Sequence, residues 1–254
     1  MKVIIIAAAS GIGKKIAESF LSQKAKVFIC DNSVSAIRKF QAEFPEIFVQ
    51  KADVAIYEEV KSFFEAVKRQ TEAIDVLINC AGIAGPTGRL EELEVEAWEA
   101  CIQVNVNGMF YCLKEAIPLL KKSKSASVIN LASSASFFGF PFRSAYTSSK
   151  WATIGLTKTL AMELGKEGIR VNAICPGSVN GERIDRVIAS DAKAQGKSIE
   201  EIRDLYVKQT SMKTFVDPED VAQLCLFLAS THARFISGQA IGLDGHTEGL
   251  STEI

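Results

Sequence analysis

Residues 3–13 read VIIIAAASGIG, a short apolar run that passes directly into a turn of small residues. The apolar run has the length and composition of a strand covered on both faces, and a helical pattern begins at Lys14. Small side chains at such a turn allow backbone N–H groups to approach a pyrophosphate, and the helix N-terminus adds a favourable field for the anion. A G-x-G pair also occurs in ordinary turns, but its place between a first strand and a first helix favours a phosphate site. We therefore expect a nucleotide phosphate at Ser10, Gly11, Ile12 and Gly13.

Six further apolar runs of strand length follow along the chain, and segments with helical spacing separate them. The clearest helix extends from Trp98 to Leu120, and another follows Tyr146. This alternation predicts an α/β fold, in which one parallel sheet is covered by helices on both faces. No repeat, low-complexity tract or linker divides the sequence, so we expect a single domain over residues 1–254. The six further strands are expected at Val27–Cys30, Ile47–Gln50, Val76–Asn79, Val128–Leu131, Val171–Cys175 and Ala240–Leu243.

The composition of the 254 residues is that of a globular protein. Hydrophobic residues make up 48% and charged residues 23%, which excludes a disordered or fibrous chain. Lys and Arg number 29 against 30 Asp and Glu, which gives a net charge of -1. Because there is no basic excess to neutralise a phosphate backbone, we expect no nucleic-acid partner.

Further expectations concern the membrane, metals and the cellular compartment. The apolar run Val3–Ala9 is too short to span a bilayer, and no separate cleavage segment follows it. Two histidines are too few for a histidine-rich metal site, so we expect no metal. The six cysteines form no C-x-x-C pair and lie mostly among apolar neighbours, which favours buried free thiols in a reducing compartment. We therefore expect a cytoplasmic protein without membrane contact.

The stretch at residues 177–216 lacks a strand pattern. Its first part suggests an amphipathic helix, Gly196 interrupts it, and Ser198 and Glu201 form a capping box that opens a second helix. Two short helices placed after a strand end are typical of a substrate lid, which we expect at about residues 182–211. A helical hairpin on the surface is the alternative interpretation.

Three more strand ends carry residues suited to a nucleotide. Asp31 lies about twenty positions beyond the glycine turn, where a carboxylate accepts hydrogen bonds from a ribose diol and repels a 2′-phosphate. This position favours NAD(H), although a solvated aspartate in a turn would give the same pattern. The third strand ends where a side chain could meet the adenine, and the fourth ends in small residues. The contacts expected at these ends are Asp31, Asp53, Val54, Asn79, Ala81 and Gly82.

Tyr146 and Lys150 stand one helical turn apart on the same helix face. A lysine there stabilises the phenolate and lowers the tyrosine pKa from its ordinary value of about 10. The tyrosine can then exchange a proton with an alcohol or carbonyl near neutral pH. Tyr57 and Lys61 have the same spacing, but they lie in a charged helix, and we interpret them as a surface pair.

A serine and an asparagine complete this group. Ser133 ends a strand thirteen positions before Tyr146 and can hold a substrate oxygen beside the phenol, whereas Phe44 stands at the same distance before Tyr57. Asn105 interrupts an otherwise apolar helix face, and a buried asparagine must find partners. It could hold a water that leads to the lysine, or serve helix packing. Four other hydroxyls are interpreted as strand-end or helix-surface groups: Ser134, Ser136, Ser148 and Ser149.

With these residues in place, the sequence resembles the short-chain dehydrogenase/reductase family over essentially its whole length. Each matching piece is weak alone, but the ordered set is specific. The pieces are Ser10-Gly11-Ile12-Gly13, Asp53-Val54, Asn79-Cys80-Ala81-Gly82, Asn105, Ser133, Tyr146-x-x-x-Lys150, Arg170-Val171-Asn172 and Pro176-Gly177.

The resemblance implies a three-layer Rossmann fold with a seven-stranded parallel sheet, and a catalytic tetrad of Asn105, Ser133, Tyr146 and Lys150. In the family's mechanism Tyr146 is the general acid/base and Ser133 positions the substrate. Lys150 binds the nicotinamide ribose and tunes Tyr146, and Asn105 supports a water in the proton relay. The segment that contains Pro176, Gly177 and Val179 is implied to flank the nicotinamide.

The sequence departs from the family pattern at three positions. Ile6-Ala7 replaces the usual Thr-Gly, and if Ala7 needs a positive φ, the strain is about 1 kcal/mol and cofactor affinity falls. Gly181 stands where a threonine commonly bonds the nicotinamide carboxamide. His246 replaces the second glycine of a commoner Asp-Gly-Gly; it could reach a neighbouring subunit's site, but we favour a capping or surface role.

The leading functional hypothesis is an oxidoreductase that transfers a hydride between NAD(H) and a secondary alcohol or ketone, with a small polar or acidic hydroxy compound as substrate. One alternative is a 3-oxoacyl-thioester reductase, and another is a regulator that only senses NAD(H). Two side-chain groups near the site bear on the substrate. Four phenylalanines could wall an apolar pocket, and Arg143, Arg183 and Arg186 could meet a carboxylate, although arginines on a lid are usually solvated.

We also expect a homotetramer. The apolar stripe from Trp98 to Leu120 is wider than one sheet face requires, and small residues on the Tyr146 helix allow another helix to approach. The segment Leu243–Ile254 carries apolar residues without a pattern of its own. The resembled family commonly pairs these two helices across one two-fold axis and its C-terminal strands across another. The small residues are Ala145, Ala152, Gly155 and Ala161.

Overall fold

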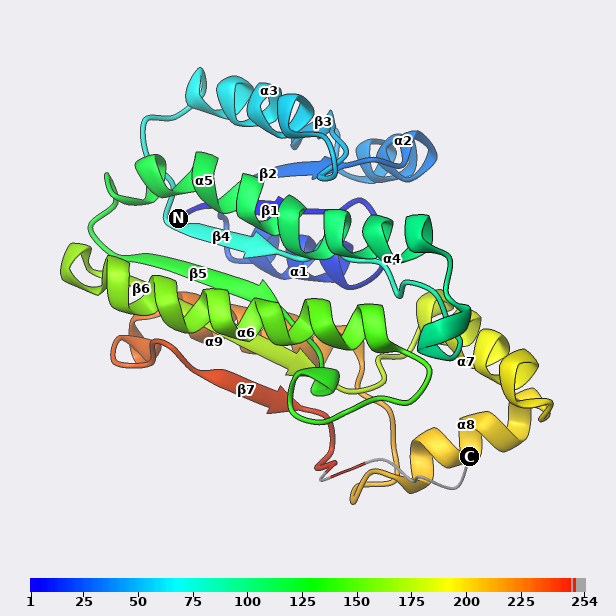
Figure 1. Ribbon diagram of the computed structural model, residues 1–254. Coiled ribbons are helices and arrows are strands. Elements are labelled where there is room, and N and C mark those ends of the chain that lie inside the picture. The colour runs from blue at the N-terminus through cyan, green and yellow to red at the C-terminus, as the bar shows by residue number, and fades with distance from the viewer. Residues whose placement is uncertain (248, 250–254) are drawn as a thin grey trace.

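In the computed structural model, which describes residues 1–247 and 249, seven parallel strands form one sheet in the order β3-β2-β1-β4-β5-β6-β7 (Figure 1). The predicted parallel α/β fold is confirmed, and each predicted strand overlaps an observed one. The sequence order reverses between β1 and β4, where open sheets of this kind bind ligands. The strands are β1 (Lys2–Ile6), β2 (Lys26–Asp31), β3 (Phe48–Lys51), β4 (Val76–Asn79), β5 (Ala126–Leu131), β6 (Ile169–Pro176) and β7 (Ala240–Leu243).

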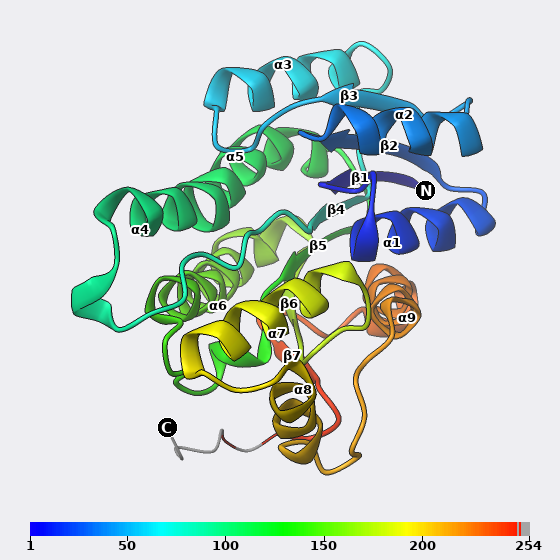
Figure 2. The ribbon, with the colours of Figure 1, turned by 90° about the vertical axis from the view of Figure 1, so that its right-hand side faces the viewer.

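Helices cover both faces of the sheet, as predicted (Figures 1 and 2). One face is covered by α1 (Gly11–Ser22), α2 (Val34–Glu43) and α9 (Pro218–Ala229). The other face is covered by α3 (Tyr57–Lys68), α5 (Gly108–Leu120) and α6 (Ser144–Leu164). This arrangement leaves the carboxyl ends of the strands at one edge of the molecule.

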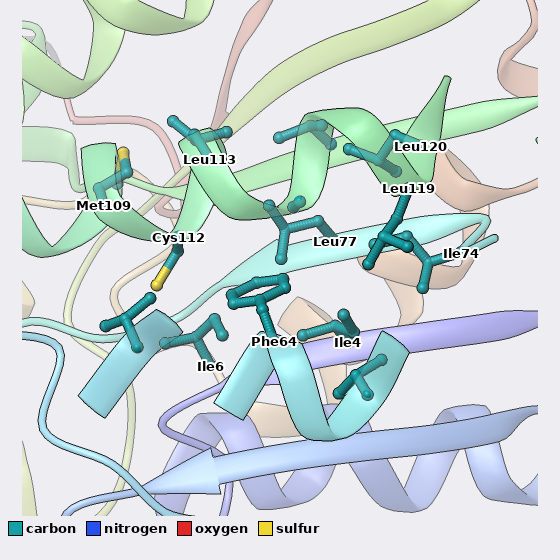
Figure 3. Close-up of a cluster of buried hydrophobic side chains, with 14 of the residues drawn as sticks. Ile4, Ile6, Phe64, Ile74, Leu77, Met109, Cys112, Leu113, Leu119 and Leu120 are labelled. Carbon is teal, nitrogen blue, oxygen red and sulfur yellow. The ribbon is translucent and has the colours of Figure 1, made fainter. Parts of the chain in front are cut away.

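Two hydrophobic cores hold the layers together, because successive strand residues point to opposite faces. Ile4 and Ile6 of β1 join the core under α3 and α5, where Phe64 is also fully buried (Figure 3). Val3 and Ile5 point to the opposite face and join the core under α1, α2 and α9. Full burial of each such side chain contributes about 1.5–3 kcal/mol. The strand ends are therefore held on a rigid base.

The segment predicted as one helix from Trp98 to Leu120 contains a change in its hydrogen-bond pattern. α4 (Val95–Ile102) is followed by a π-helical turn, Gln103–Asn107, which leads into α5. A π turn widens the helix and redirects the side chains within it. Asn105 lies in this turn and is buried. The prediction of an uninterrupted helix is corrected here, because apolar spacing does not reveal a single widened turn.

Beyond the carboxyl ends of the strands, α7 (Glu182–Gln195) and α8 (Ile199–Lys208) form a pair of helices at the place predicted for the lid (Figure 1). Gly196 ends α7 with φ 64, a left-handed conformation that glycine adopts without strain. The predicted capping box of Ser198 and Glu201 is present. The pair has its own small apolar core: Ile184, Ile188, Ala192, Ile202 and Phe215. Movement of these helices as a lid stays a prediction.

The six cysteines are free, as predicted, and all but the half-buried Cys80 are buried. In the part of the chain that the structure describes, no helix is both long and apolar enough to cross a bilayer. No three His, Cys, Asp or Glu side chains among residues 1–247 and 249 gather as a potential metal site.

Candidate active site

The turn between β1 and α1 has the tight backbone that a phosphate site requires. A Cβ at Gly13 would lie 2.2 Å from the carbonyl oxygen of Ala7, so only glycine fits there. Gly11 has φ +54, and nothing lies within 4 Å of the place that its Cβ would take. The side chain of Ser10 makes no capping hydrogen bond to α1. An open helix N-terminus without a side-chain cap fits the pyrophosphate of a dinucleotide.

Ala7 has the positive φ that its place in the glycine motif demands. Its φ is 58, in the left-handed region, where a Cβ costs about 1 kcal/mol. Its N–H donates to the carbonyl of Cys30 at 2.8 Å, which ties the turn to β2. The substitution of alanine for glycine is thus accommodated with strain, without loss of the turn.

Asp31, the last residue of β2, reaches across to the same turn. One carboxylate oxygen accepts the N–H of Ala9 at 3.0 Å, and the other accepts the N–H of Ser33 at 2.9 Å. The residue is only 7% exposed, which contradicts the alternative of a solvated aspartate. Each carboxylate oxygen has a further lone pair, so the group can still accept hydrogen bonds from ribose hydroxyls.

The end of β3 is built more for packing than for ligand contact. Asp53 is half-buried and accepts the N–H of Ala55 at 2.9 Å. Val54 is buried beneath the start of α5, where a Cβ at Gly108 would lie 2.9 Å from the Val54 side chain. Val54 therefore offers little of its side chain to an adenine, whereas the carboxylate of Asp53 stays partly accessible.

Asn79 joins two strands below the site. It is 2% exposed, and its amide donates to the side-chain oxygen of Asn130 on β5 at 2.9 Å. Asn130 in turn donates to Thr157 of α6 at 2.9 Å. Within the described residues the Oδ1 atom of Asn79 has no hydrogen-bond partner, and it is a position for a water or a ligand donor.

Asn105 fastens the loop after β4 onto α6. Its Oδ1 accepts the N–H of Ile83 at 2.8 Å, and its Nδ2 donates to the Ile83 carbonyl at 3.0 Å and to Ser149 at 2.9 Å. A Cβ at Gly82 would lie 3.3 Å from Asn105 Oδ1 and 3.4 Å from Lys150 Nζ. Ala81 and Gly82 therefore continue β4 into a loop that passes close to both side chains.

The interpretation of Ser149 as a helix-surface hydroxyl is wrong, whereas Ser136 does follow the end of a strand but is buried. Ser149 is fully buried and contacts Asn105, while Ser136 is 3% exposed and donates to the Lys150 carbonyl at 3.0 Å. A signal was present in the sequence, because small residues recur every four positions along α6. These buried residues are Ala145, Ser149, Thr153 and Thr157.

The structure brings Ser133, Tyr146 and Lys150 together at the carboxyl end of β5. The Nζ atom of Lys150 lies 5.7 Å from the centre of the Tyr146 ring and donates to the carbonyl of Leu131 at 2.9 Å. Ser133 follows β5, and its hydroxyl is close enough to Tyr146 to contribute to the lowered pKa of the phenol. The hydroxyl also accepts the N–H of Ala135 at 3.2 Å, which fixes its orientation.

The pKa of Tyr146 is below its ordinary value of 10, although burial, the largest single influence, raises it. The positive charges of Lys150 and Arg183, with the hydroxyl of Ser133 and the charge of Arg143, outweigh that burial. The pKa of Lys150 is lowered as well, chiefly by burial and in part by Arg183, while Tyr146 opposes the shift. A half-buried phenol with a stabilised phenolate is suited to proton exchange with a substrate oxygen.

Tyr57 shows that the spacing alone does not create this environment. Its hydroxyl donates to Glu115 at 2.9 Å, and this hydrogen bond to a carboxylate raises the pKa of Tyr57. Lys61 is exposed. The Tyr57 pair therefore lacks the features of an acid/base site, in agreement with its interpretation from the sequence, although Tyr57 itself is half-buried.

The segment expected beside the nicotinamide follows β6. Pro176 ends the strand, and Gly177 packs so closely on Asp244 that a Cβ would lie 2.9 Å from the aspartate side chain. Val179 forms an isolated parallel bridge further along. Gly181 has φ +134, a conformation that is essentially restricted to glycine, so a threonine at this position would be strained.

His246 contacts the end of the lid segment. Its ring Nδ1 atom lies 2.6 Å from the hydroxyl of Ser211. Its backbone N–H donates to the side chain of Asp244 at 3.0 Å. The backbone of Ser211 also donates to the His246 carbonyl at 2.9 Å. Within the chain, His246 thus links the residues after β7 to those after α8.

The three arginines near the site have different surroundings. Arg143 is 4% exposed and is paired with Asp191 of α7 at 2.6 Å, so the prediction of a solvated side chain is wrong for this residue. Arg183 donates to the carbonyl of Gly82 at 3.1 Å. Arg186 is exposed and lies 3.6 Å from Glu182.

Comparison with known proteins agrees with this geometry. A family model described as enoyl-(acyl carrier protein) reductase matches residues 6–247. The chain is 31% identical over 247 residues to a 3-oxoacyl-[acyl-carrier-protein] reductase of Staphylococcus epidermidis, covering 95% of this chain and 96% of the relative. It is also 31% identical over 251 residues to D-beta-hydroxybutyrate dehydrogenase of Rhizobium meliloti, with coverage of 95% and 96%.

A solved structure supports the same relationship. The fold matches a variant of actinorhodin polyketide ketoreductase, determined with NADPH, with a TM-score of 0.91 and 28% identity. The match covers 96% of this chain and 95% of the ketoreductase.

Proposed function

Because this chain belongs to the short-chain dehydrogenase/reductase family, we propose that it transfers a hydride reversibly between NAD(H) and a secondary alcohol or ketone. The observation that carries the proposal is the cluster of Ser133, Tyr146 and Lys150, in which the pKa of the half-buried phenol is lowered. A site that only senses NAD(H) has no use for such a phenol.

A proton path can be assigned to this chain's own residues. In the oxidation of an alcohol, Tyr146 as phenolate accepts the hydroxyl proton, and the same group returns it in the reduction of a ketone. Ser133 hydrogen-bonds the substrate oxygen, and Lys150 stabilises the phenolate. We propose that Asn105 supports a water molecule in the proton relay that leads to Lys150. A nicotinamide cofactor, when bound, supplies or accepts the hydride.

We propose NAD(H) as the preferred cofactor, with its pyrophosphate at the α1 N-terminus. Asp31 supports this choice because its buried carboxylate would accept hydrogen bonds from the adenosine ribose and repel a 2′-phosphate. Family membership does not decide the matter, since the matching ketoreductase was determined with NADPH. The free cysteines support a reducing compartment, and we propose the cytoplasm.

A 3-oxoacyl-thioester reductase is the second candidate, and one relative carries that name. Asp31 counts against it, because many such reductases use NADPH. A panel of secondary alcohols and hydroxy acids, tested together with a 3-oxoacyl thioester, separates these activities. The reduced-nicotinamide absorbance reports turnover in each case, and no turnover with any compound would favour a regulator that only senses NAD(H).

Replacement of the phenol tests the proposed mechanism directly. Tyr146→Phe removes the proton-transfer group and should lower kcat by about 10²-fold or more, with cofactor binding largely intact. Tyr57→Phe is the matched control, because it has the same spacing to a lysine but a pKa shifted in the opposite direction. Near-normal turnover in folded Tyr146→Phe would remove Tyr146 from the mechanism.

A further inference from the structure

A cavity of about 320 Å³ lies between the loop after β4 and α7, and the proton-transfer residues Ser133, Tyr146 and Lys150 are not among those that line it. The loop after β4, residues 82–85, forms one part of its wall, and Arg183, Arg186 and Ser190 of α7 form another, together with Arg143. This volume is enough for a small ligand. None of the residues that line it is acidic.

The arginines give this cavity an uncompensated positive charge. The charge of Arg143 is already balanced by buried Asp191. The partner of Arg186 is Glu182 at 3.6 Å, a loose pair whose side chains are 74% and 94% exposed. Arg183 forms one hydrogen bond to a carbonyl, and among residues 1–247 and 249 no carboxylate lies within ion-pair distance of it. Its remaining N–H donors are available for an anion.

The cavity adjoins the groups that handle the proton. Gly82, which forms part of the wall, passes so close to Lys150 that a Cβ on it would lie 3.4 Å from the amine. The positive charge of Arg183 also acts on Tyr146 and contributes to its lowered pKa. A substrate whose alcohol carbon lies at Tyr146 can therefore extend its other end toward Arg183.

We propose that Arg183, assisted by Arg186, binds a carboxylate of the substrate, so that the substrate is a small hydroxy acid or the corresponding oxo acid. The assignment rests on the proposed function. Arg183 is exposed and is held only by its hydrogen bond to the Gly82 carbonyl, and its guanidinium can still offer a carboxylate two parallel charge-assisted hydrogen bonds. A neutral ester of the same shape would leave the arginine without its anion.

The first experiment compares acids with esters. Values of kcat/KM are measured for small hydroxy acids and for their methyl esters, with the wild-type protein and with Arg183→Gln, Arg186→Gln and Lys193→Gln. We expect the wild type to prefer the acid, and kcat/KM of Arg183→Gln to fall about 10- to 100-fold more with the acid than with the ester. The effect of the Arg183 charge on Tyr146 is common to both substrates and cancels in this ratio. The loss in Arg186→Gln should be smaller. Lys193→Gln removes a charge from the same helix outside the cavity and should change neither value.

The second experiment needs no turnover. Calorimetry with the NAD⁺-loaded protein measures the binding of butyrate, with butyramide as its neutral analogue, and NADH fluorescence measures cofactor affinity. Butyrate should bind more tightly than butyramide, Arg183→Gln should abolish that difference, and the NADH dissociation constant should stay within about twofold.

The outcomes separate this assignment from the proposed function. Equal use of acid and ester by the wild type, or an unchanged acid preference in Arg183→Gln, overturns the carboxylate site. A loss of NADH affinity that equals the loss of acid use also overturns it, because Arg183 would then serve the cofactor. Butyrate binding that depends on Arg183, in a protein that oxidises no alcohol, supports the anion site and overturns the proposed function instead.

Discussion

Asp31 has two roles at the residue scale, because its carboxylate both holds the glycine turn and faces the proposed ribose position. The backbone contacts to Ala9 and Ser33 are visible only in the structure, whereas the charge is visible in the sequence. Any substitution therefore changes the turn as well as cofactor choice, and the variant has to be selected with both roles in mind.

We predict that Asp31→Asn narrows the preference for NAD(H) over NADP(H), because the negative charge that repels a 2′-phosphate is lost while one acceptor oxygen remains. The ratio of the two kcat/KM values is the measurement. Asp31→Ala should narrow the ratio too, but with lower activity for both cofactors, since both backbone contacts disappear. Equal use of the two cofactors by the wild type would contradict the role of Asp31.

The contacts of Tyr146 and Arg143 differ in how well the sequence could predict them. The spacing of Tyr146 and Lys150 predicts only that they share a helix face, because a helical turn has fixed geometry. That Ser133 joins them was expected from its place at a strand end and from the resemblance to a known family. The buried pairing of Arg143 with Asp191 was not predictable, because these two residues lie 48 positions apart on elements whose relative placement no local pattern specifies.

Among the elements, the π turn at Gln103–Asn107 could not be predicted from the local sequence either. The apolar spacing of the surrounding helix predicted a helix and a buried Asn105, and both are present. The widened turn depends on contacts of Asn105 with the loop after β4 and with Ser149, which become known only when the helices are packed. A capping box, in contrast, is entirely local, and the one at Ser198 was predicted correctly.

The buried pair of Arg143 and Asp191 predicts a large loss of stability when it is broken. Asp191→Ala leaves a buried guanidinium without its carboxylate and also removes the partner of the Tyr206 hydroxyl, so we expect a loss of about 3–5 kcal/mol. The free energy of unfolding in urea is the measurement. Asp185→Ala is the control, because its ion pair with Arg203 is exposed and should contribute at most about 1 kcal/mol. Similar losses in the two variants would argue against the buried pair.

We predict that α7 and α8 act as a lid over the site. Their apolar core is small and separate from the two cores of the sheet, so their amides should exchange faster than those of β1 and β4. Binding of NAD(H) and a hydroxy acid should slow exchange across residues 182–211, because Arg183 and Arg186 would then hold the ligand. The amides of α3, which packs against the sheet and is not part of the α7–α8 pair, provide an internal reference. Unchanged amide exchange with both ligands present would contradict the lid and support the alternative of a static helical hairpin on the surface.

For the whole molecule, alternation of strands and helices was sufficient to predict the class and the number of strands. A strand of a parallel sheet is buried on both faces, so each strand appears in the sequence as a continuous apolar run of four to eight residues. The strand order, with β1 between β2 and β4, does not follow from local pattern, since it depends on which crossovers bury the most apolar surface. The resemblance to a known family implied a seven-stranded Rossmann sheet, and the order itself comes from the structure.

The outer surface of α5 and α6 keeps apolar side chains exposed, and this bears on assembly. Phe110 is 50% exposed, Trp151 is 51% exposed and Met162 is 86% exposed. The two helices lie next to each other with their outer sides uncovered (Figure 1). Ala145 is fully buried within its own chain, so the expectation that it allows another helix to approach is wrong for this residue. Ala152 and Gly155 are exposed, and for them the expectation stays a prediction.

We predict a homotetramer in which α5 and α6 pair across one two-fold axis and the β7 edge of the sheet pairs across another. Phe235, which is 89% exposed near β7, belongs to the second surface, while residues 248 and 250–254 of the predicted C-terminal contact lie outside the described residues. Sedimentation equilibrium at micromolar concentration should give a mass near four times 27.6 kDa. Trp151→Glu places a charge on the first surface and should leave dimers that retain the second. A wild-type species at the mass of one chain would refute the assembly, and a wild-type dimer would support only one of the two surfaces.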